Sequence, residues 1–249
     1  MFFRKSAGET LLMTGAAGRL GTMLRGALSH AGGDIRLTDL RKVAPLQRGE
    51  HFVKADLTSP RAMRKLCKGA SVVLHLGAVT EEVDWKRLTR ANVDGVTNLL
   101  EAAKAAGVRR FVFASSMHVL GMHPDHAALD ERSPVAPTTR YGVTKAFGEA
   151  ACRLFAERDG MSVTVLRIGH VVADMTKAPR GRGISANDFA ALVRLALDEH
   201  RAGFRIFHAV APNPHQRVTD GRLERDHGFA FRDPVEGPAG MPLLERRFG

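Results

Sequence analysis

The stretch Thr14-Gly15-Ala16-Ala17-Gly18-Arg19-Leu20-Gly21 decides the fold of this chain. It follows an apolar segment, 10–14, that is typical of a strand, and it precedes residues 20–31, where the apolar spacing is typical of a helix. Its three glycines suit a tight turn, a close approach of the backbone to a pyrophosphate, and close packing of the helix on the strand. The free N–H groups at the start of the helix also attract a diphosphate. A glycine repeat alone indicates only turns, but between a strand and a helix it predicts a dinucleotide site.

Strand-like and helix-like segments alternate along the rest of the chain. The further strand-like segments are 34–38, 51–54, 71–76, 110–114, 162–168 and 204–209. The further helix-like segments are 61–67, 85–106, the stretch after residue 140, and 189–199. Such alternation favours a parallel sheet with helices on both faces. We therefore expect an α/β fold, a Rossmann-like doubly wound parallel sheet with a small C-terminal region that covers the substrate.

Charge and composition argue against several classes of protein. The 249 residues carry a formal net charge of +11, but the basic residues are scattered and almost no aromatic residues lie between them, which argues against a nucleic-acid partner. No run approaches the roughly 18 apolar residues of a membrane span, and the first residues do not fit a secretory signal. Cys67 and Cys152 lack metal-type spacing and are expected to be buried free thiols, and the histidines do not cluster as metal ligands. We expect a cytoplasmic protein without a metal, whose basic surface attracts an anionic small molecule.

The only tyrosine of the chain, Tyr141, lies four residues before Lys145. On a helix these two residues share a face, so the ammonium is expected to lower the pKa of the phenol from its usual value of about 10. A hydroxyl of the pair Ser115-Ser116, which follows a strand-like segment, can bind the same substrate oxygen. Together these groups can take a proton from an alcohol while a cofactor takes the hydride. A Tyr-x-x-x-Lys pair alone is most often a surface tyrosine and a solvated lysine, and the order of glycine turn, serine pair and Tyr/Lys helix is what favours catalysis.

Two aspartates indicate which dinucleotide would bind. Asp39 ends the second strand-like segment, about 20 residues after the glycine turn, where a carboxylate accepts hydrogen bonds from ribose hydroxyls and repels a 2′-phosphate. It favours NAD over NADP, although Arg41 and Lys42 offer positive charge to such a phosphate. Asp56 follows the third strand-like segment, where it can meet the adenine amino group or belong to the cap of the next helix.

These motifs together resemble the extended, epimerase-like branch of the short-chain dehydrogenase/reductase superfamily over residues 10–170. Besides the glycine turn, the resemblance rests on His75-Leu76-Gly77-Ala78, Asn92-Val93-Asp94-Gly95, Asn98-Leu99-Leu100-Glu101-Ala102-Ala103, Ser115-Ser116, Tyr141-Gly142-Val143-Thr144-Lys145 and Phe147-Gly148-Glu149. It implies one Rossmann-type domain, 1–249, with a dinucleotide-binding core that includes the catalytic helix, 10–170, and a small substrate-binding portion, 171–249. The residues that it implies for NAD binding are Gly15, Gly18, Arg19, Leu20, Gly21, Asp39, Leu40, Asp56, Leu57, Leu76, Gly77, Ala78, Asn92, Tyr141, Lys145 and Val171.

A closer resemblance is to the uronate dehydrogenases within that branch. It rests on Phe113-Ala114-Ser115-Ser116-Met117-His118-Val119-Leu120-Gly121, Arg167-Ile168-Gly169 and Ser185-Ala186-Asn187-Asp188-Phe189, and on the short region after Pro212, since nucleotide-sugar epimerases need a longer one. The resemblance implies NAD-dependent oxidation of a hexuronic acid, such as glucuronate or galacturonate, at C1 to an aldarolactone. Tyr141 would take the proton, Ser116 would orient the hydroxyl, and Lys145 would lower the pKa of the phenol and hold the nicotinamide ribose.

The resemblance also implies a substrate site, with departures from the family pattern. Its residues are Thr80, Ser116, Met117, His118, His170 and Arg180. Arg180 is nearest to the arginine that holds the carboxylate in this family, and Arg182 is the alternative, since a guanidinium binds a carboxylate through two bonds. Both can instead be solvated loop charges. Met117 replaces an asparagine, His170 stands where a serine is usual, and residues 216–249 match poorly, so the departures bear on which sugar is bound.

Two other functions stay open on the sequence alone. A sugar epimerase, dehydratase or reductase of the same superfamily would use the same cofactor site on another substrate, and an epimerase would retain NAD without net reduction. A non-catalytic dinucleotide-binding sensor is a different class, and the intact Ser/Tyr/Lys set argues against it. In this superfamily the helices over 85–106 and 141–158 often form a dimer interface, so the resemblance also allows a homo-oligomer.

Overall fold

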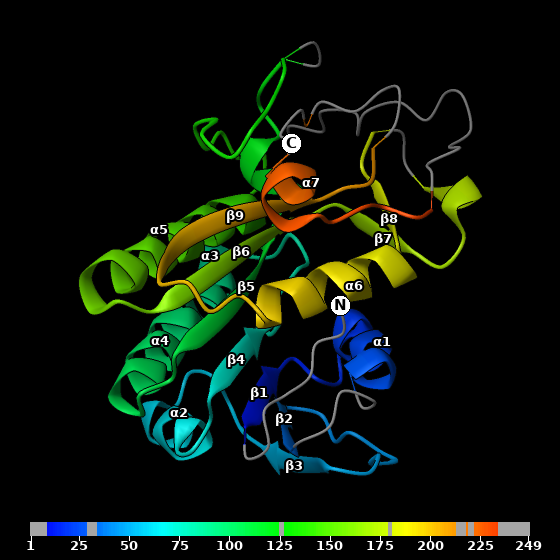
Figure 1. Ribbon diagram of the computed structural model, residues 1–249. Coiled ribbons are helices and arrows are strands. Elements are labelled where there is room, and N and C mark those ends of the chain that lie inside the picture. The colour runs from blue at the N-terminus through cyan, green and yellow to red at the C-terminus, as the bar shows by residue number, and fades with distance from the viewer. Residues whose placement is uncertain are drawn as a thin grey trace.

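The centre of the molecule is a seven-stranded, wholly parallel sheet in the order β3-β2-β1-β4-β5-β6-β9 (Figure 1). The computed structural model describes residues 9–28, 34–124, 127–178, 181–212, 218 and 222–233. The strands are β1 (Thr10–Thr14), β2 (Asp34–Asp39), β3 (Glu50–Lys54), β4 (Val72–His75), β5 (Arg110–Ser116), β6 (Ser162–Ile168) and β9 (Gly203–Ala209). The predicted doubly wound α/β fold is confirmed.

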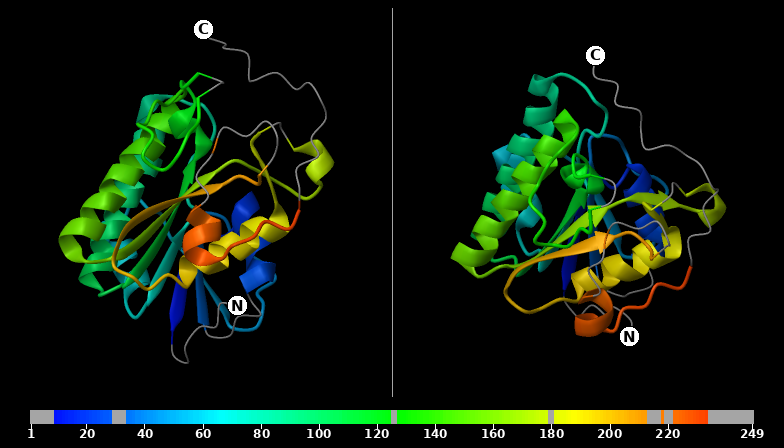
Figure 2. Two further views of the ribbon diagram at one scale, coloured as in Figure 1. Left: turned by 45° about the horizontal axis from the view of Figure 1, so that its top comes forward. Right: turned by 90° about the horizontal axis from the view of Figure 1, so that it is seen from above.

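Helices cover both faces of this sheet (Figures 1 and 2). On one face, α1 (Arg19–Leu28) and α6 (Ala186–Leu197) bury their apolar sides with the sheet in a single core cluster. On the other face, α2 (Pro60–Cys67), α4 (Gly95–Ala105) and α5 (Arg140–Asp159) form a second cluster, which contains both free cysteines in buried positions, as predicted. Two layers of helix therefore enclose strands that are apolar on both sides; every residue of β5 and β6 is buried.

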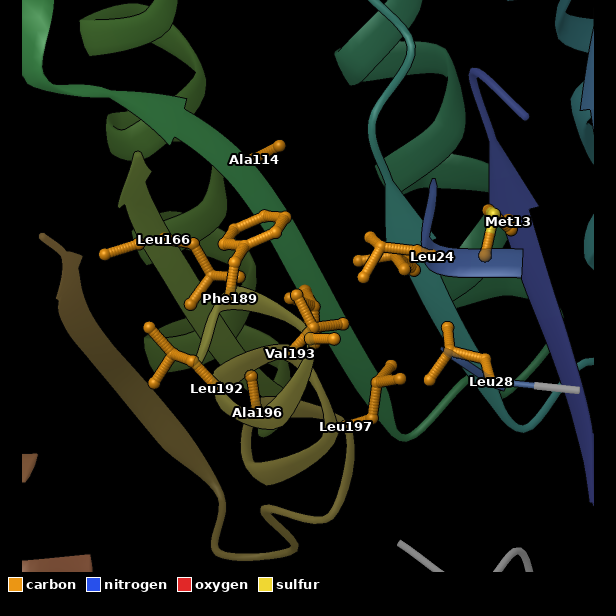
Figure 3. Close-up of a cluster of buried hydrophobic side chains, with 14 of the residues drawn as sticks. Met13, Leu24, Leu28, Ala114, Leu166, Phe189, Leu192, Val193, Ala196 and Leu197 are labelled. Atoms are coloured by element: carbon orange, nitrogen blue, oxygen red, sulfur yellow. The ribbon is translucent and has the colours of Figure 1, made fainter. Parts of the chain in front are cut away.

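Residues beyond 170 complete this body. Figure 3 shows Phe189, Val193 and Leu197 of α6 in one cluster with Leu24 and Leu28 of α1. β9 pairs along its full length with β6 at the edge of the sheet. The region that the sequence assigns to substrate binding thus also supplies a helix and a strand to the main core.

The strand order places a switch point at the carboxyl ends of β1 and β4. β1 is central, and the chain continues to β2 on one side and later to β4 on the other. In such sheets ligands bind in the crevice beyond the carboxyl ends of the strands at this point. The predicted site segments follow the ends of β1, β2, β4, β5 and β6, so the topology gathers them at one edge.

Four features differ from the sequence-based expectation. The helix predicted over 85–106 consists of α3 (Trp85–Leu88), a π-helical turn η2 (Thr89–Asp94) and α4. The short pair β7 (His170–Val172) and β8 (Gly183–Ser185), the 3₁₀ turns η3 (Met117–Leu120) and η4 (Met175–Lys177), and α7 (Arg222–His227) were not expected. These elements of three to six residues are too short for a period of 2 or 3.6 residues to show in the sequence.

A search of the described helices for one long and apolar enough to cross a membrane finds none.

Candidate active site

The glycine turn between β1 and α1 is packed so tightly that two of its glycines leave no room for a side chain. Gly15 has a φ of 70°, and a Cβ there would lie 2.6 Å from the backbone nitrogen of Gly77. A Cβ on Gly21 would lie 2.3 Å from the carbonyl oxygen of Gly15. A positive φ and backbone-to-backbone contact both favour glycine. The turn therefore presents bare backbone in front of the N-terminus of α1, which fits a pyrophosphate.

The carboxylate of Asp39 lies against this turn at the end of β2. One of its oxygens accepts a hydrogen bond from the backbone N–H of Ala17 at 3.0 Å, and the other accepts one from the N–H of Arg41 at 3.0 Å. The Arg41 guanidinium donates to the carbonyl oxygen of Ala17 at 2.8 Å. Both the carboxylate that would bind a ribose and the nearest cation are thus held at the glycine turn.

Other residues expected at the adenine end occupy different environments. Leu40 is exposed, whereas Leu57 packs against Gly77 and Gly95, where an added Cβ would lie 2.8 Å and 3.1 Å from its side chain. An Asp56 oxygen accepts from the N–H of Thr58 at 2.9 Å, and Ser59 caps α2. Asp56 therefore shapes the turn before α2; its contact with adenine stays a prediction.

A chain of hydrogen bonds links the glycine turn to the helix that carries Tyr141. The hydroxyl of Thr14 is bonded to Nδ1 of His75 at 2.7 Å and accepts from the N–H of Gly77 at 3.2 Å. Asn92, in the π-helical turn, accepts from the N–H of Val79 at 2.8 Å and donates to its carbonyl oxygen at 2.9 Å. The same Asn92 amide donates to the Thr144 hydroxyl at 2.9 Å. Asn92 thus fixes the loop after β4 against α5.

The three predicted catalytic residues meet at the end of β5. Ser116 is the last residue of β5, and its side chain is hydrogen-bonded to Tyr141 near the start of α5. Nζ of Lys145 lies 5.6 Å from the centre of the Tyr141 ring. The ring of His118 meets the Tyr141 ring edge-on at 5.9 Å. The geometry brings a phenol, a hydroxyl, an ammonium and an imidazole to one place.

The pKa of Tyr141 differs from the expectation based on Lys145. Burial raises the pKa of Tyr141 to about 12, and the hydrogen bond with Ser116 acts in the opposite direction. The prediction that Lys145 lowers this pKa below its usual value is therefore wrong for the protein alone. The reason is desolvation of the phenolate by burial, while the ammonium of Lys145 donates its hydrogen bond to the carbonyl oxygen of Ala114, at 2.7 Å.

Lys145 itself is almost fully buried. Burial lowers the pKa of Lys145 to about 8, against the opposing effects of Cys152 and the Glu149 carboxylate. Its Nζ also lies 4.8 Å from the centre of the Phe113 ring. The ammonium is thus held between α5 and β5 and loses its proton at a lower pH than an exposed lysine does.

The β7–β8 ribbon brings further positive charge beside Tyr141. The N–H of His170 donates to the carbonyl oxygen of Arg182 at 2.7 Å, and Arg19 donates to the carbonyl oxygen of Val171 at 2.8 Å. His170 is exposed, but partial desolvation of its ring lowers its pKa, and the charges of Arg182 and Arg19 add to this effect. The pKa of His118 is likewise lowered, first by burial and then by Arg182 and His170, while Glu82 opposes the shift.

The remaining predicted substrate residues differ in their exposure to solvent, and one of them is not described. Arg180 lies outside the described residues. Thr80 is exposed, with its N–H bonded to the Glu81 carboxylate at 3.2 Å. Met117 is partly buried against Val119 and Leu120.

Two acidic residues lie at this site that the sequence analysis did not assign to it, although it includes Glu149 in a family motif. The Glu82 carboxylate accepts from the N–H groups of Arg140 and Tyr141, at 3.0 and 3.4 Å, and so faces the start of α5. Glu149 lies one turn beyond Lys145. No spacing links Glu82 to α5 in the sequence, whereas the four-residue step from Lys145 to Glu149 was a signal that could have been used.

Comparisons with known proteins identify the family of the chain. Residues 11–236 match the model of the NAD dependent epimerase/dehydratase family. The chain is 33% identical over 205 residues to a uronate dehydrogenase of Pseudomonas syringae pv. tomato, covering 82% of this chain and 74% of the relative. It is 33% identical over 264 residues to an NAD-dependent glucose-6-phosphate dehydrogenase of Haloferax volcanii, covering 95% and 99%. The crystal structure of uronate dehydrogenase from Agrobacterium tumefaciens superposes with a TM-score of 0.86 at 30% identity, covering 92% of this chain and 86% of that one. The chain belongs to the NAD dependent epimerase/dehydratase family.

Proposed function

We propose that this protein is an NAD-dependent dehydrogenase that oxidises a hexuronic acid at C1 to an aldarolactone. The observation that carries the proposal is the contact of Ser116 with Tyr141, one helical turn from buried Lys145, at the carboxyl edge of the sheet beside the glycine turn. The uronate dehydrogenases among its relatives support the choice of substrate.

The residues at the glycine turn fit NAD. Gly15 and Gly21 leave bare backbone for the pyrophosphate, and Asp39 presents a carboxylate for the adenosine ribose. The loop from Leu76 to Ala78 and the side chain of Lys145 would line the nicotinamide half. When bound, oxidised NAD supplies the hydride acceptor and a positive charge that favours the phenolate form of a nearby tyrosine.

The proton of the sugar hydroxyl is assigned to Tyr141. Its phenolate would accept the proton from the C1 hydroxyl, and the hydroxyl of Ser116 would donate to the same substrate oxygen and hold it in place. Because Asn92 and Ser116 tie the start of α5 to the loop after β4 and to β5, these groups are ordered before substrate arrives.

A sugar carboxylate finds positive charge at this site. The charge of Arg182 acts on both His118 and His170, so all three side chains belong to one electrostatic environment next to Tyr141. Within the described residues we assign the carboxylate to Arg182, with His170 beside it; Arg180 stays the alternative that the sequence suggests.

The test is reduction of NAD by the purified protein with a panel of sugars. Glucuronate and galacturonate should be oxidised, and glucose, which lacks the carboxylate, should not. Glucose 6-phosphate belongs in the panel because a relative that matches nearly the whole chain is named for it. Turnover of glucose or glucose 6-phosphate without turnover of either uronate would leave a dehydrogenase and overturn the uronate assignment.

A matched pair of variants tests the carboxylate site. Arg182→Gln should raise the KM for glucuronate, whereas Arg87→Gln, which removes a cation from α3 outside the site, should not. Equal KM values in both variants would assign the carboxylate elsewhere.

We also propose that the protein acts in the cytoplasm and forms a homo-oligomer through α3 and α5. Buried free thiols suit a reducing compartment. Trp85, Phe147 and Leu154 expose apolar surface on these two helices. A monomeric mass by light scattering at micromolar concentration would contradict the oligomer.

A further inference from the structure

A buried ion pair lies behind the Tyr141/Lys145 face of α5. The guanidinium of Arg167, in β6, donates to both oxygens of the Glu149 carboxylate, from Nε at 3.1 Å and from Nη2 at 2.8 Å. The hydroxyl of Ser115, in β5, donates to the same carboxylate at 2.6 Å. Two strands and the helix of Tyr141 therefore meet at one side chain.

The charged side chains of Arg167, Glu149 and the nearby Lys145 are all buried. Arg167 is 2% exposed, Lys145 3% and Glu149 5%. Two cations and one anion thus share the interior, and a buried charge is tolerated only when it is paired and hydrogen-bonded. Glu149 is the anion that makes the burial of both cations acceptable.

The other titratable groups that face Lys145 do not supply negative charge near neutral pH. From α5, Tyr141 stays protonated because burial raises its pKa, and Cys152 stays a thiol because burial raises its pKa too. From β4, burial lowers the pKa of His75 to about 3, so its ring is neutral. On β6, Arg167 carries a positive charge and is paired with Glu149. Among these groups Glu149 carries the negative charge.

The cluster also connects the two groups that act on the substrate hydroxyl in the proposed reaction. Ser115 is the neighbour of Ser116 on β5, and Glu149 is two turns beyond Tyr141 on α5. The bond from Ser115 to Glu149 therefore fixes the strand of one group to the helix of the other.

We propose that Glu149 is a positioning residue: its carboxylate, held by Arg167 and Ser115, keeps Lys145 in the ammonium form and locks the Tyr141 helix onto the Ser116 strand. Its catalytic meaning rests on the proposed dehydrogenase function, but its effect on Lys145 does not.

The direct test is the titration of Lys145 by NMR in protein labelled with ¹³C at lysine Cε. The Lys145 resonance is assigned by its absence from the Lys145→Met spectrum. In Glu149→Gln the midpoint of this titration should move to lower pH, since the carboxylate no longer opposes desolvation. In Glu149→Asp, which keeps the charge, the midpoint should stay closer to that of the unaltered protein.

Two controls separate this effect from disturbed packing. Cys152→Ala removes another buried side chain beside Lys145 that is uncharged near neutral pH, and should shift the midpoint less than Glu149→Gln does. Glu149→Gln can fail to fold because Arg167 loses its partner, so the double variant Glu149→Gln/Arg167→Gln, which removes both charges, should show a downward shift that is smaller because a buried cation is lost as well. An unchanged midpoint in the single and double variants, or an equal shift in Cys152→Ala, would overturn the proposal.

The kinetic counterpart is the pH profile of uronate oxidation. In Glu149→Gln, kcat should stop rising at a lower pH than in the unaltered protein, because Lys145 loses its proton at a lower pH. Glu149→Asp, which keeps the charge, should restore the pH profile in part. A uniform fall of kcat at all pH values would show a merely structural role. Absence of turnover in the unaltered protein would instead count against the proposed function, and the NMR titration would still decide the role of Glu149.

Discussion

His75 is a buried imidazole whose protonation state is fixed by its surroundings. Its ring stacks on Phe113 at 5.8 Å, and its Nδ1 is hydrogen-bonded to the hydroxyl of Thr14. Burial lowers the pKa of His75 to about 3, and the charge of Lys145 acts in the same direction. The side chain therefore folds as a neutral ring, and the fold loses stability wherever the unfolded chain binds a proton that the folded one does not.

The expected pH dependence follows from this shift. An unfolded histidine titrates near 6.5, so stability from His75 is complete above that pH and is lost as pH falls toward about 3. The loss is about 1.4 kcal/mol per pH unit, or about 2 kcal/mol at pH 5. His75→Asn keeps a polar partner for Thr14 but does not titrate, so the difference in unfolding free energy between the two proteins should shrink as pH falls from 7 to 5. Urea denaturation at several pH values measures it, and parallel curves for both proteins would contradict the account.

At the scale of elements, glycine within α5 permits contact with β5. A Cβ on Gly148 would lie 2.4 Å from Cζ of Phe113, the ring on which Lys145 rests. Gly26, in the last turn of α1, has no atom of the described residues within 4 Å of the place where its Cβ would be. An added methyl group is therefore expected to have opposite effects on stability at these two helical glycines.

These glycines give a matched pair of substitutions. Gly148→Ala should destabilise the protein by about 1–3 kcal/mol through overpacking and reduce activity by shifting Phe113 and Lys145. Gly26→Ala should stabilise it by about 0.4–1 kcal/mol, since alanine favours a helix and limits the unfolded chain. Thermal unfolding of both variants checks the signs, and stabilisation by Gly148→Ala would refute the packing described.

The elements also show how far sequence reasoning reaches. The glycine turn and the apolar strands predicted the sheet and its helices because each signal is local and repeats over several turns or residues. The π-helical turn could not be predicted, since it depends on Asn92 reaching Val79 and Thr144, which are distant in sequence. The raised pKa of Tyr141 depends on burial, which the Tyr/Lys spacing does not report.

At the scale of the whole molecule, one aspartate ties the last described segment to the body. Asp188, in the first turn of α6, is buried and accepts hydrogen bonds from the N–H groups of Arg232 and Asp233, both at 3.0 Å. The sequence related this residue to a family motif but not to residues 232 and 233, because the contact spans 44 residues.

Removal of the Asp188 side chain should lower the free energy of unfolding and make the last described segment more accessible to a protease. Asp188→Ala should cost about 1–3 kcal/mol, since two backbone donors lose their partner. The exposed neighbour Asn187→Ala should change stability by no more than about 0.5 kcal/mol. Denaturant unfolding gives the energies, and faster limited proteolysis after residue 212 in Asp188→Ala alone would locate the effect. Equal behaviour of the two variants would show that Asp188 does not hold the segment.

In the proposed reaction the Tyr141 hydroxyl performs the proton transfer in NAD-dependent oxidation of a uronic acid. The measurement is NADH formation from glucuronate by the unaltered protein and by Tyr141→Phe, with NAD affinity measured on the same samples. The account predicts NADH formation by the unaltered protein, a loss of about 10²–10⁴-fold in kcat in Tyr141→Phe, and similar NAD affinity in both. Oxidation at an undiminished rate by Tyr141→Phe would contradict it.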